Sequence, residues 1–359
     1  MNSDIQPAAD MQADQSSQTK LAVAAMLVPL FFVTLFAACI IGAYHKPHPN
    51  SIKVGVVGPP NLTAPLRADV EKSAGSAFDI RPVTTLTDAV HAVRQRNLNA
   101  AFVPTPDPKR PATVIVASAN GRLVATAAET LARLVVAAQG AQVVVREVRP
   151  LAAGDEIGLG IFMFMIVCTI CGYITPTILE TATPGLLPRR RYPIIAATAV
   201  LVPTIAYLIG GLGYGVYKGS FGTILAFIGV GALYTFAIGL GTRLLQTLIG
   251  PVAIFISLAI LVFLNIASLG ATYTAPVLGS FWRFLNHFWI GASAVNAQRG
   301  ILYFGGQGVG TEMIRLLAWT AVIVVLLLLP VSRKLERKRE RAIVGSSPRT
   351  PAPQVATEA

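Results

Sequence analysis

Charged residues are scarce in this chain: they make up only 13% of its 359 residues, whereas 53% are hydrophobic. A soluble protein of this length carries about 25% charged residues. The shortage excludes an ordinary soluble protein and indicates an integral membrane protein. The formal net charge of +12 does not indicate a nucleic-acid-binding protein, because the charge lies beside apolar runs, where it orients spans and meets anionic lipids.

Cysteine is also scarce, with three residues that cannot form a disulfide framework. All three, Cys39, Cys168 and Cys171, fall within apolar runs. Cys168 and Cys171 have the spacing of a redox or metal motif, but no second pair of ligands accompanies them. We therefore expect them to pack inside the membrane, and we expect no metal site.

Nucleotide-binding and catalytic motifs are missing from the sequence. Neither the G-x-G-x-x-G nor the G-x-x-x-x-G-K-[ST] pattern occurs, and the glycine-rich run 305–310 has no lysine. The stretch 56–61 after the first expected strand is predicted to be a simple turn. No nucleophile and base are paired in the soluble part of the chain. The sequence therefore predicts no catalytic residue, no cofactor and no enzymatic activity.

Six apolar runs are each long enough to cross a bilayer, which takes about 20 residues. The first, 21–44, is interpreted as a retained anchor and not as a signal peptide, since its apolar core is too long. Residues 1–20 are predicted to be a disordered cytoplasmic tail, and residues 336–359 a basic, disordered one. The five further spans form a membrane domain over 156–335; they are expected at 157–178, 193–217, 221–242, 244–271 and 316–332.

Residues 45–155 have the alternating strand and helix patterns of a small α/β or α+β domain. Strands are expected near 52–58, 78–84, 99–104, 113–119 and 142–148, and helices near 66–73, 86–96 and 121–139. The predicted fold class is thus a six-span helical membrane protein with an extracytoplasmic domain between the first two spans.

Basic residues in the short loops predict the orientation. Arg189, Arg190 and Arg191 lie between the second and third spans, Arg243 lies between the fourth and fifth, and a basic cluster follows the sixth. The positive-inside rule makes this side cytoplasmic. Both termini are then cytoplasmic, and we expect the chain in a bacterial plasma membrane.

The same count of spans places the segment 280–306 outside, before the last span. Its aromatic residues are typical of a membrane interface, and we expect two short re-entrant helices that end at Gly305 and Gly306. The candidate residues for an external gate are Trp282, Arg283, His287, Trp289 and Arg299. Two interpretations of the charged side chains remain open: they line an outer mouth, or they extend toward lipid headgroups.

The spans are almost free of ionisable residues, which argues against an ion-coupled transporter or a selective ion channel. The polar residues within them are expected to make helix–helix hydrogen bonds. They are Thr175, Tyr207, Tyr214, Tyr234, Gln246 and Asn265.

Two stretches carry a resemblance to a known family. "RPLAAGDEIGLGIFMFMIVCTICGYI" (149–174) and "FWRFLNHFWIGASAVNAQRGILYFGG" (281–306) are similar to the entry into the second span and to the last external loop of the phage-infection-protein-like (YhgE/Pip-like) branch. That branch belongs to the ABC-2 type transporter permeases. The resemblance covers about residues 20–335. It implies a permease that pairs as a homodimer and is driven by a separate ATP-binding subunit.

The resemblance implies a docking surface for that ATPase on a cytoplasmic loop, and the loop 179–193 is the best candidate. Its residues Glu180, Arg189, Arg190 and Arg191 either contact the partner or only set the topology. The expected function is export of a hydrophobic or amphipathic substrate, with membrane lipids as further contacts. The alternative is a non-transporting receptor or secretion-accessory protein whose external domain binds a partner.

Overall fold

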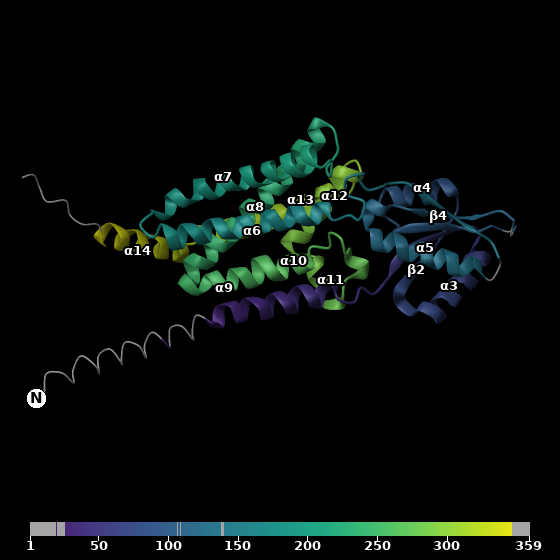
Figure 1. Ribbon diagram of the computed structural model, residues 1–359, viewed down its shortest axis with the longest axis horizontal. Coiled ribbons are helices and arrows are strands. Elements are labelled where there is room, and N and C mark those ends of the chain that lie inside the picture. Colours follow the sequence, from purple (N-terminus) through teal and green to yellow (C-terminus); the bar gives the residue numbers. More distant parts are fainter. Residues whose placement is uncertain (1–18, 20–25, 106, 108, 138–139, 347–359) are drawn as a thin grey trace, which may run out of the picture.

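The computed structural model describes residues 19, 26–105, 107, 109–137 and 140–346. A bundle of helices forms one part of the molecule, and a small domain built on a sheet lies at one end of it (Figure 1). The predicted tail 1–20, apart from Thr19, and residues 347–359 of the predicted basic tail lie outside the described residues.

Among the described residues, five helices are long and apolar enough to cross a membrane: Met26–Tyr44, Gly160–Ala182, Pro188–Gly213, Phe221–Ser268 and Val309–Leu328. Their outward faces carry large apolar side chains, such as Leu201 and Val325, which are each 57% exposed. Such extensive exposed apolar surface suits contact with lipid and not with water. These helices indicate a multi-pass membrane protein.

The first apolar helix contains η1 (Ala37–Ile41) and α2 (Gly42–Tyr44). The remaining elements of the bundle are α6 (Gly160–Ala182), α7 (Pro188–Tyr207), η4 (Leu208–Gly213), α8 (Phe221–Ile249), η5 (Gly250–Val252), α9 (Ala253–Ser257), η6 (Leu258–Leu264), α10 (Asn265–Ser268), η7 (Ala275–Val277), α11 (Ser280–Asn286), α12 (Ile290–Tyr303), α13 (Val309–Leu328) and α14 (Pro330–Ser346). Residues 336–346, expected to begin a disordered tail, are helical within α14.

The 48-residue stretch Phe221–Ser268 folds back on itself at Gly250. This residue has φ +71°, a conformation that favours glycine, and Pro251 follows it. The two arms run antiparallel, since the amide of Asn265 donates to the hydroxyl of Tyr234 and a Cβ on Gly241 would lie 3.2 Å from Leu261. The turn therefore falls at 250–252, and Arg243, expected in a loop, lies instead inside α8. Sequence hydropathy misplaced it because both arms are apolar up to the glycine.

The sheet domain contains β1 (Ile52–Val57), α3 (Pro60–Ala74), η2 (Gly75–Ala77), β2 (Phe78–Val83), α4 (Leu86–Arg94), β3 (Ala100–Val103), β4 (Ala112–Val116), η3 (Ser118–Asn120), α5 (Arg122–Ala137) and β5 (Val143–Glu147). Its five strands have the order β2-β1-β3-β4-β5. Neighbouring strands are parallel except for β3 and β4, which are antiparallel. The domain thus has a small mixed sheet.

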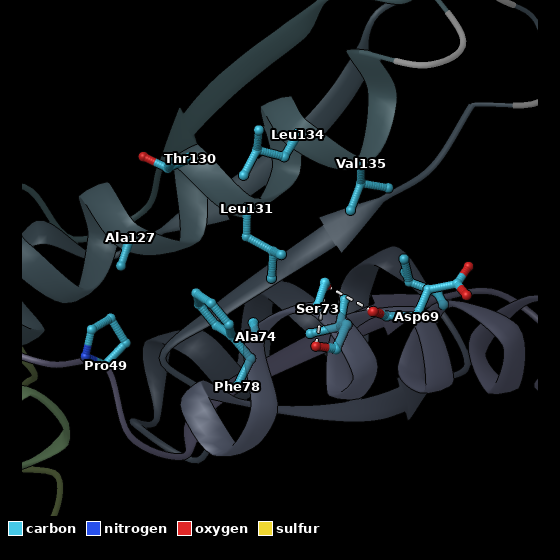
Figure 2. A pocket seen from close by; sticks show the side chains of 12 residues that line it. Pro49, Asp69, Ser73, Ala74, Phe78, Ala127, Thr130, Leu131, Leu134 and Val135 are labelled. Carbon is cyan, nitrogen blue, oxygen red and sulfur yellow. Dashed lines mark hydrogen bonds between the residues drawn. The ribbon is translucent and has the colours of Figure 1, made fainter.

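The two faces of the sheet bury different helices because strand side chains alternate. Val54 and Val56 of β1 share a core with Val70 of α3 and Ala128 of α5. Ala101 and Ile115 point to the other face and pack with α4. An apolar groove of about 700 Å³ remains open between α3 and α5 (Figure 2).

The segment 280–306 contains two helices, α11 and α12, which confirms that prediction of its secondary structure. Small residues let α12 sit deep in the bundle, where Ala294, Val295 and Ala297 are completely buried. After α12, Gly305 and Gly306 have φ +59° and +89° and turn the chain toward α13. Of the two helices, α12 therefore packs inside the bundle, whereas α11 keeps side chains such as Phe281 and Phe284 exposed.

Candidate functional site

The loop between α6 and α7, the candidate docking surface, lies at the end of the bundle away from the sheet domain (Figure 1). Glu180 belongs to the last turn of α6, and Arg191 to the first turn of α7. Each charge is unfavourable next to its own helix dipole, because anions are stabilised at helix N-termini and cations at C-termini. Pairing the two offsets both penalties.

Arg191 is almost fully buried, with 5% of its side chain exposed. It forms a salt bridge with Glu180 and donates to the carbonyls of Leu186 and Thr183, each at 3.2 Å. Its guanidinium thus holds the loop 183–187 against the end of α6. Arg191 is a structural part of the loop's interior.

Arg243 joins this pair to two more helices. Its side chain is 1% exposed and lies 3.0 Å from Glu180 and 3.2 Å from Glu336 of α14. The hydroxyl of Tyr192 donates to Glu336 at 2.8 Å. We call Glu180, Arg191, Arg243 and Glu336 the charge cluster; its two arginines and two glutamates tie α6, α7, α8 and α14 together.

Arg189 and Arg190 lie beside the charge cluster but point outward, since both are exposed. Nearby, α13 and α14 border a hollow of about 590 Å³ whose polar lining is entirely basic. The lining side chains are Leu328, Pro330, Arg333, Lys334, Arg337, Lys338 and Arg341. This end of the bundle therefore has basic side chains at its surface, and the paired charges of the charge cluster lie beneath them.

Of the candidate gate residues, Trp282, Arg283, His287 and Trp289 lie on or just after α11. His287 is exposed, and its Nδ1 lies 2.8 Å from the carbonyl oxygen of Arg283. Trp282 and Trp289 are half-buried; Trp289 packs against Trp319 of α13, with ring centroids 5.8 Å apart. These four residues are at the surface or edge of the bundle.

Arg299, the fifth candidate, lies apart from them and is 4% exposed. It donates to the carbonyls of Gly270 at 3.1 Å and Ala271 at 2.5 Å, just beyond the end of α10. Burial lowers the pKa of Arg299, and the positive charge of Arg96 lowers it further. The structure uses this cation to satisfy carbonyls left free where α10 unwinds.

Arg96 of the sheet domain and Asn296 of α12 connect the two parts of the molecule. Arg96 has φ +66°, donates to the side-chain oxygens of Asn296 at 3.0 Å and Asn120 at 3.1 Å, and lies 5.4 Å from the ring centre of Phe304. Asn296 also accepts from Arg299 at 3.1 Å. Neither Arg96 nor Asn296 could be predicted as a contact residue from the sequence, because no local pattern relates positions 200 residues apart.

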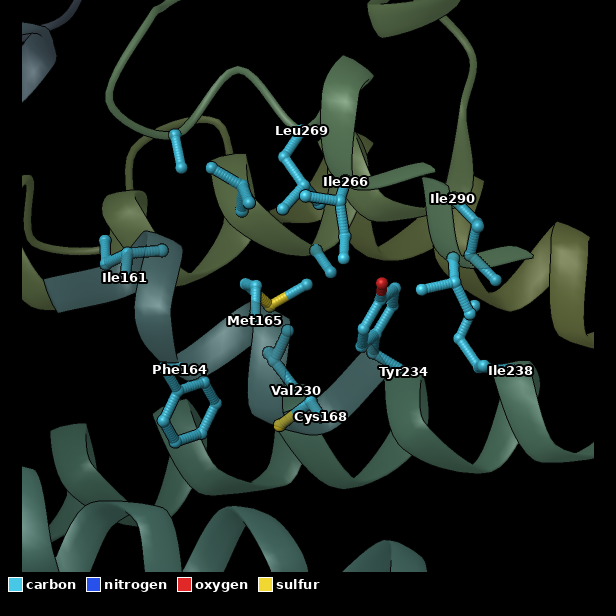
Figure 3. Close-up of a cluster of buried hydrophobic side chains, with 14 of the residues drawn as sticks. Ile161, Phe164, Met165, Cys168, Val230, Tyr234, Ile238, Ile266, Leu269 and Ile290 are labelled. Carbon is cyan, nitrogen blue, oxygen red and sulfur yellow. The ribbon is translucent and has the colours of Figure 1, made fainter. Parts of the chain in front are cut away.

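A polar group lies in the middle of the otherwise apolar bundle core. The hydroxyls of Tyr234 and Thr169 are 2.6 Å apart, and the Asn265 amide donates to Tyr234. Figure 3 shows the Tyr234 hydroxyl surrounded by Met165, Ile266 and Ile290. The expected helix–helix hydrogen bonds are confirmed for Tyr234 and Asn265.

Within the described residues, no three His, Cys, Asp or Glu side chains gather in a group that could hold a metal ion. Cys39 and Cys168 are buried, and Cys171 is half-buried. Comparisons with known protein families, with curated proteins and with solved structures found no match to this chain.

Proposed function

We propose that this chain is the membrane-spanning permease subunit of an ABC-type exporter. It works as a homodimer, is driven by a separate ATP-binding subunit, and moves a hydrophobic or amphipathic substrate. One observation carries the proposal: the charge cluster braces the α6–α7 loop against α8 and α14, while Arg189 and Arg190 of the same loop remain exposed. A braced loop with exposed cations is suited to receive force from an acidic partner surface.

The proposed permease has six membrane spans, because the stretch Phe221–Ser268 is taken as two spans and not one. A continuous helix of 48 residues would be about 72 Å long at 1.5 Å per residue, more than twice the roughly 30 Å of a hydrocarbon core. The reversal at Gly250 supports two spans in its place. Both described basic surfaces then share the cytoplasmic side, and the sheet domain belongs to the opposite side of a bacterial plasma membrane.

Substrate would enter the permease from the cytoplasmic leaflet and leave past α11 and α12. The burial of α12 among α6, α8, α10 and α13 supports its role as the closed exit. Arg299 and Asn296 link α12 to the sheet domain through Arg96. Movement of α12 would therefore be coupled to the position of that domain.

The docking proposal is tested by co-purification of the chain with its ATPase from native membranes. Replacing the exposed pair, Arg189→Ala with Arg190→Ala, should remove the ATPase while the permease keeps its thermal unfolding temperature. Each exposed cation contributes little to folding, typically within about 0.5 kcal/mol, so a loss of the partner would report on docking.

Arg191→Ala is the contrasting variant. It removes a buried partner of Glu180 and should lower the unfolding temperature as well as the yield of complex. Retention of the ATPase in the double variant Arg189→Ala, Arg190→Ala would contradict the docking role. Purification of the wild-type chain with no ATPase under any condition would contradict the exporter.

The second candidate function is a non-transporting receptor or secretion accessory whose sheet domain binds a ligand or partner. The open groove between α3 and α5 favours it, since a domain used only as a spacer would have closed its core. An exporter loses substrate movement when its ATPase is inactivated by mutation. A receptor keeps ligand binding in the same cells, so the two functions are separable.

A further inference from the structure

The groove between α3 and α5 is a built feature of the sheet domain. Its walls are Leu66, Val70 and Ala74 of α3, facing Ala127, Leu131 and Val135 of α5 (Figure 2). Beneath it lies a small void lined only by apolar residues, including Val54 and Val56 of the sheet. Leu134, at the rim, is 69% exposed. The domain therefore exposes a strip of its own core.

We propose that this groove binds the hydrocarbon chain of a membrane lipid. The inference does not depend on export: it concerns the sheet domain and holds whether or not the chain pairs with an ATPase.

The side chains that line the groove favour a hydrocarbon ligand over a polar one. The two hydroxyls in the groove already donate to their own helices, Ser73 to the carbonyl of Asp69 at 2.7 Å and Thr130 to that of Thr126 at 2.9 Å. Asp69 is exposed and is the one charged residue of the lining. A peptide or sugar would leave its polar groups unpaired against such walls, which is costly. A saturated chain would not.

The size of the groove favours a small ligand over a protein partner. Its volume of about 700 Å³ lies within the range of about 300–1,000 Å³ that is usual for small-molecule sites. Twelve residues line it, whereas a standard protein–protein interface uses about 20–30 residues on each side. A second copy of the chain is therefore the weaker occupant.

The position of the groove makes lipid the nearest source of hydrocarbon. Pro49, at one end of the groove, follows the first apolar helix by five residues, since that helix ends at Tyr44. The next residue, Asn50, donates its backbone N–H to the carbonyl of Pro276 at 2.8 Å. Val277 of the same loop shares the core that floors the groove. The groove thus begins where the sheet domain meets the helical bundle.

The test places the photo-cross-linking residue p-benzoylphenylalanine at position 134 of the full chain, reconstituted in nanodiscs of phosphatidylethanolamine and phosphatidylglycerol. Irradiation should add the mass of a phospholipid to the protein. The matched control carries the same residue at Leu86, which is 43% exposed on α4, across the sheet. Its lipid adduct should be at least tenfold weaker.

Two further measurements identify the site. Leu131→Trp fills the groove and should abolish the adduct at position 134, while thermal unfolding confirms that the variant is folded. Lysophospholipids of increasing tail length should compete, with about fourfold tighter binding per methylene group until the groove is full. A cross-linked protein dimer, equal lipid adducts at positions 134 and 86, or no adduct at 134 would each overturn the proposal.

Discussion

Arg243 is bound by carboxylates from two different helices, and this decides what its removal would do. Glu180 and Glu336 remain partly exposed, at 26% and 17%, while Arg243 is 1% exposed. Burying an arginine is tolerable only when its charge is paired and hydrogen-bonded. The residue therefore stabilises the contact of α8 with α6 and α14, and its charge has no role at the surface.

We expect Arg243→Leu to lower the free energy of unfolding by about 3–5 kcal/mol, because it leaves carboxylates without their buried partner. The free energy of unfolding of Arg243→Lys should lie between those of the wild type and Arg243→Leu. One ammonium group keeps the charge but cannot reproduce a planar guanidinium that reaches two acceptors. The measurement is denaturant unfolding in detergent, with the exposed Arg189→Ala as the matched control. A leucine variant as stable as the control would show that the charge cluster is not a brace.

Asp155 marks the entry into α6 and has a measurable pH signature. Its carboxylate accepts from the backbone N–H groups of Leu159 at 2.7 Å and Gly160 at 2.9 Å. Burial raises the pKa of Asp155, and these hydrogen bonds lower it in part. The folded-state pKa of Asp155 lies above the unfolded value, so the protonated side chain stabilises the fold. This contribution to the free energy of unfolding is fully present at pH values below the ordinary carboxyl range. That contribution is lost as the pH rises through the raised value.

Asp155→Asn keeps the accepting oxygen and removes this titration, so its stability relative to wild type should improve as the pH rises through that window. Asp155→Ala loses the acceptor and should be less stable by about 0.5–2 kcal/mol, as expected for a lost helix cap. Thermal unfolding between pH 3 and pH 8 checks both. A pH-independent difference between wild type and the asparagine variant would refute the raised pKa.

Single residues of the charge cluster were only partly predictable. Glu180 and Arg191 were identified, but as surface residues, because a sequence does not show which cations of an arginine triplet turn inward. Glu336 was overlooked within a basic run, although an acidic residue among so many cations is itself a signal of a paired position. Arg243 could be placed only once the turn at Gly250 was known.

At the scale of elements, the local patterns were informative and the long-range pairings were not. The helix expected at 121–139 is α5, Arg122–Ala137, and the strand expected at 113–119 overlaps β4, Ala112–Val116. Apolar periodicity reports such elements directly. The parallel pairing of β1 with β3, and the groove left between α3 and α5, depend on residues far apart in the chain.

Close packing of α6 against α8 depends on glycine and gives a matched pair of variants. A Cβ on Gly172 of α6 would lie 2.9 Å from the backbone oxygen of Thr235, which has no side-chain freedom to move away. Gly172→Ala should therefore destabilise the bundle by about 1–3 kcal/mol, the usual cost of overpacking. A Cβ on Gly229 of α8 meets nothing within 4 Å.

Gly229→Ala should be neutral or slightly stabilising, since alanine favours a helix over glycine by about 1 kcal/mol. Denaturant unfolding of both variants in the same detergent measures the contrast. Equal stabilities would mean that α6 and α8 are less closely packed than the structure describes.

At the scale of the whole molecule, the sheet domain and the bundle are joined through polar contacts that no sequence pattern announces. Arg96 of the sheet domain meets Asn296 of α12 within hydrogen-bonding distance, and Asn296 also accepts from Arg299 of the same helix. The left-handed conformation of Arg96 ends α4, where the backbone N–H groups of Asn97 and Arg96 donate to the carbonyls of Ala92 and Val93. The domain is thus held in one orientation on the bundle.

The orientation of the molecule across the membrane can be tested with three single cysteines in a background from which Cys39, Cys168 and Cys171 have been removed. Gln307→Cys lies beside the end of α12, Lys338→Cys on α14, and Val252→Cys in the turn after α8; all three positions are exposed. In the orientation that we propose from the positive-inside rule, the basic end faces the cytoplasm. A membrane-impermeant maleimide should therefore label Gln307→Cys in intact cells, and the other two only after permeabilisation.

Val252 is the decisive position of the three, because its location depends on the reversal at Gly250 and on six spans. If Phe221–Ser268 did not return across the membrane, Val252→Cys would lie within or beyond the bilayer and would not share the labelling of Lys338→Cys. Labelling of Gln307→Cys only from the cytoplasm would invert the molecule, and the sheet domain with it. A permease whose basic loop faced outward could not meet a cytoplasmic ATPase, so this single experiment bears on the fold and on the exporter together.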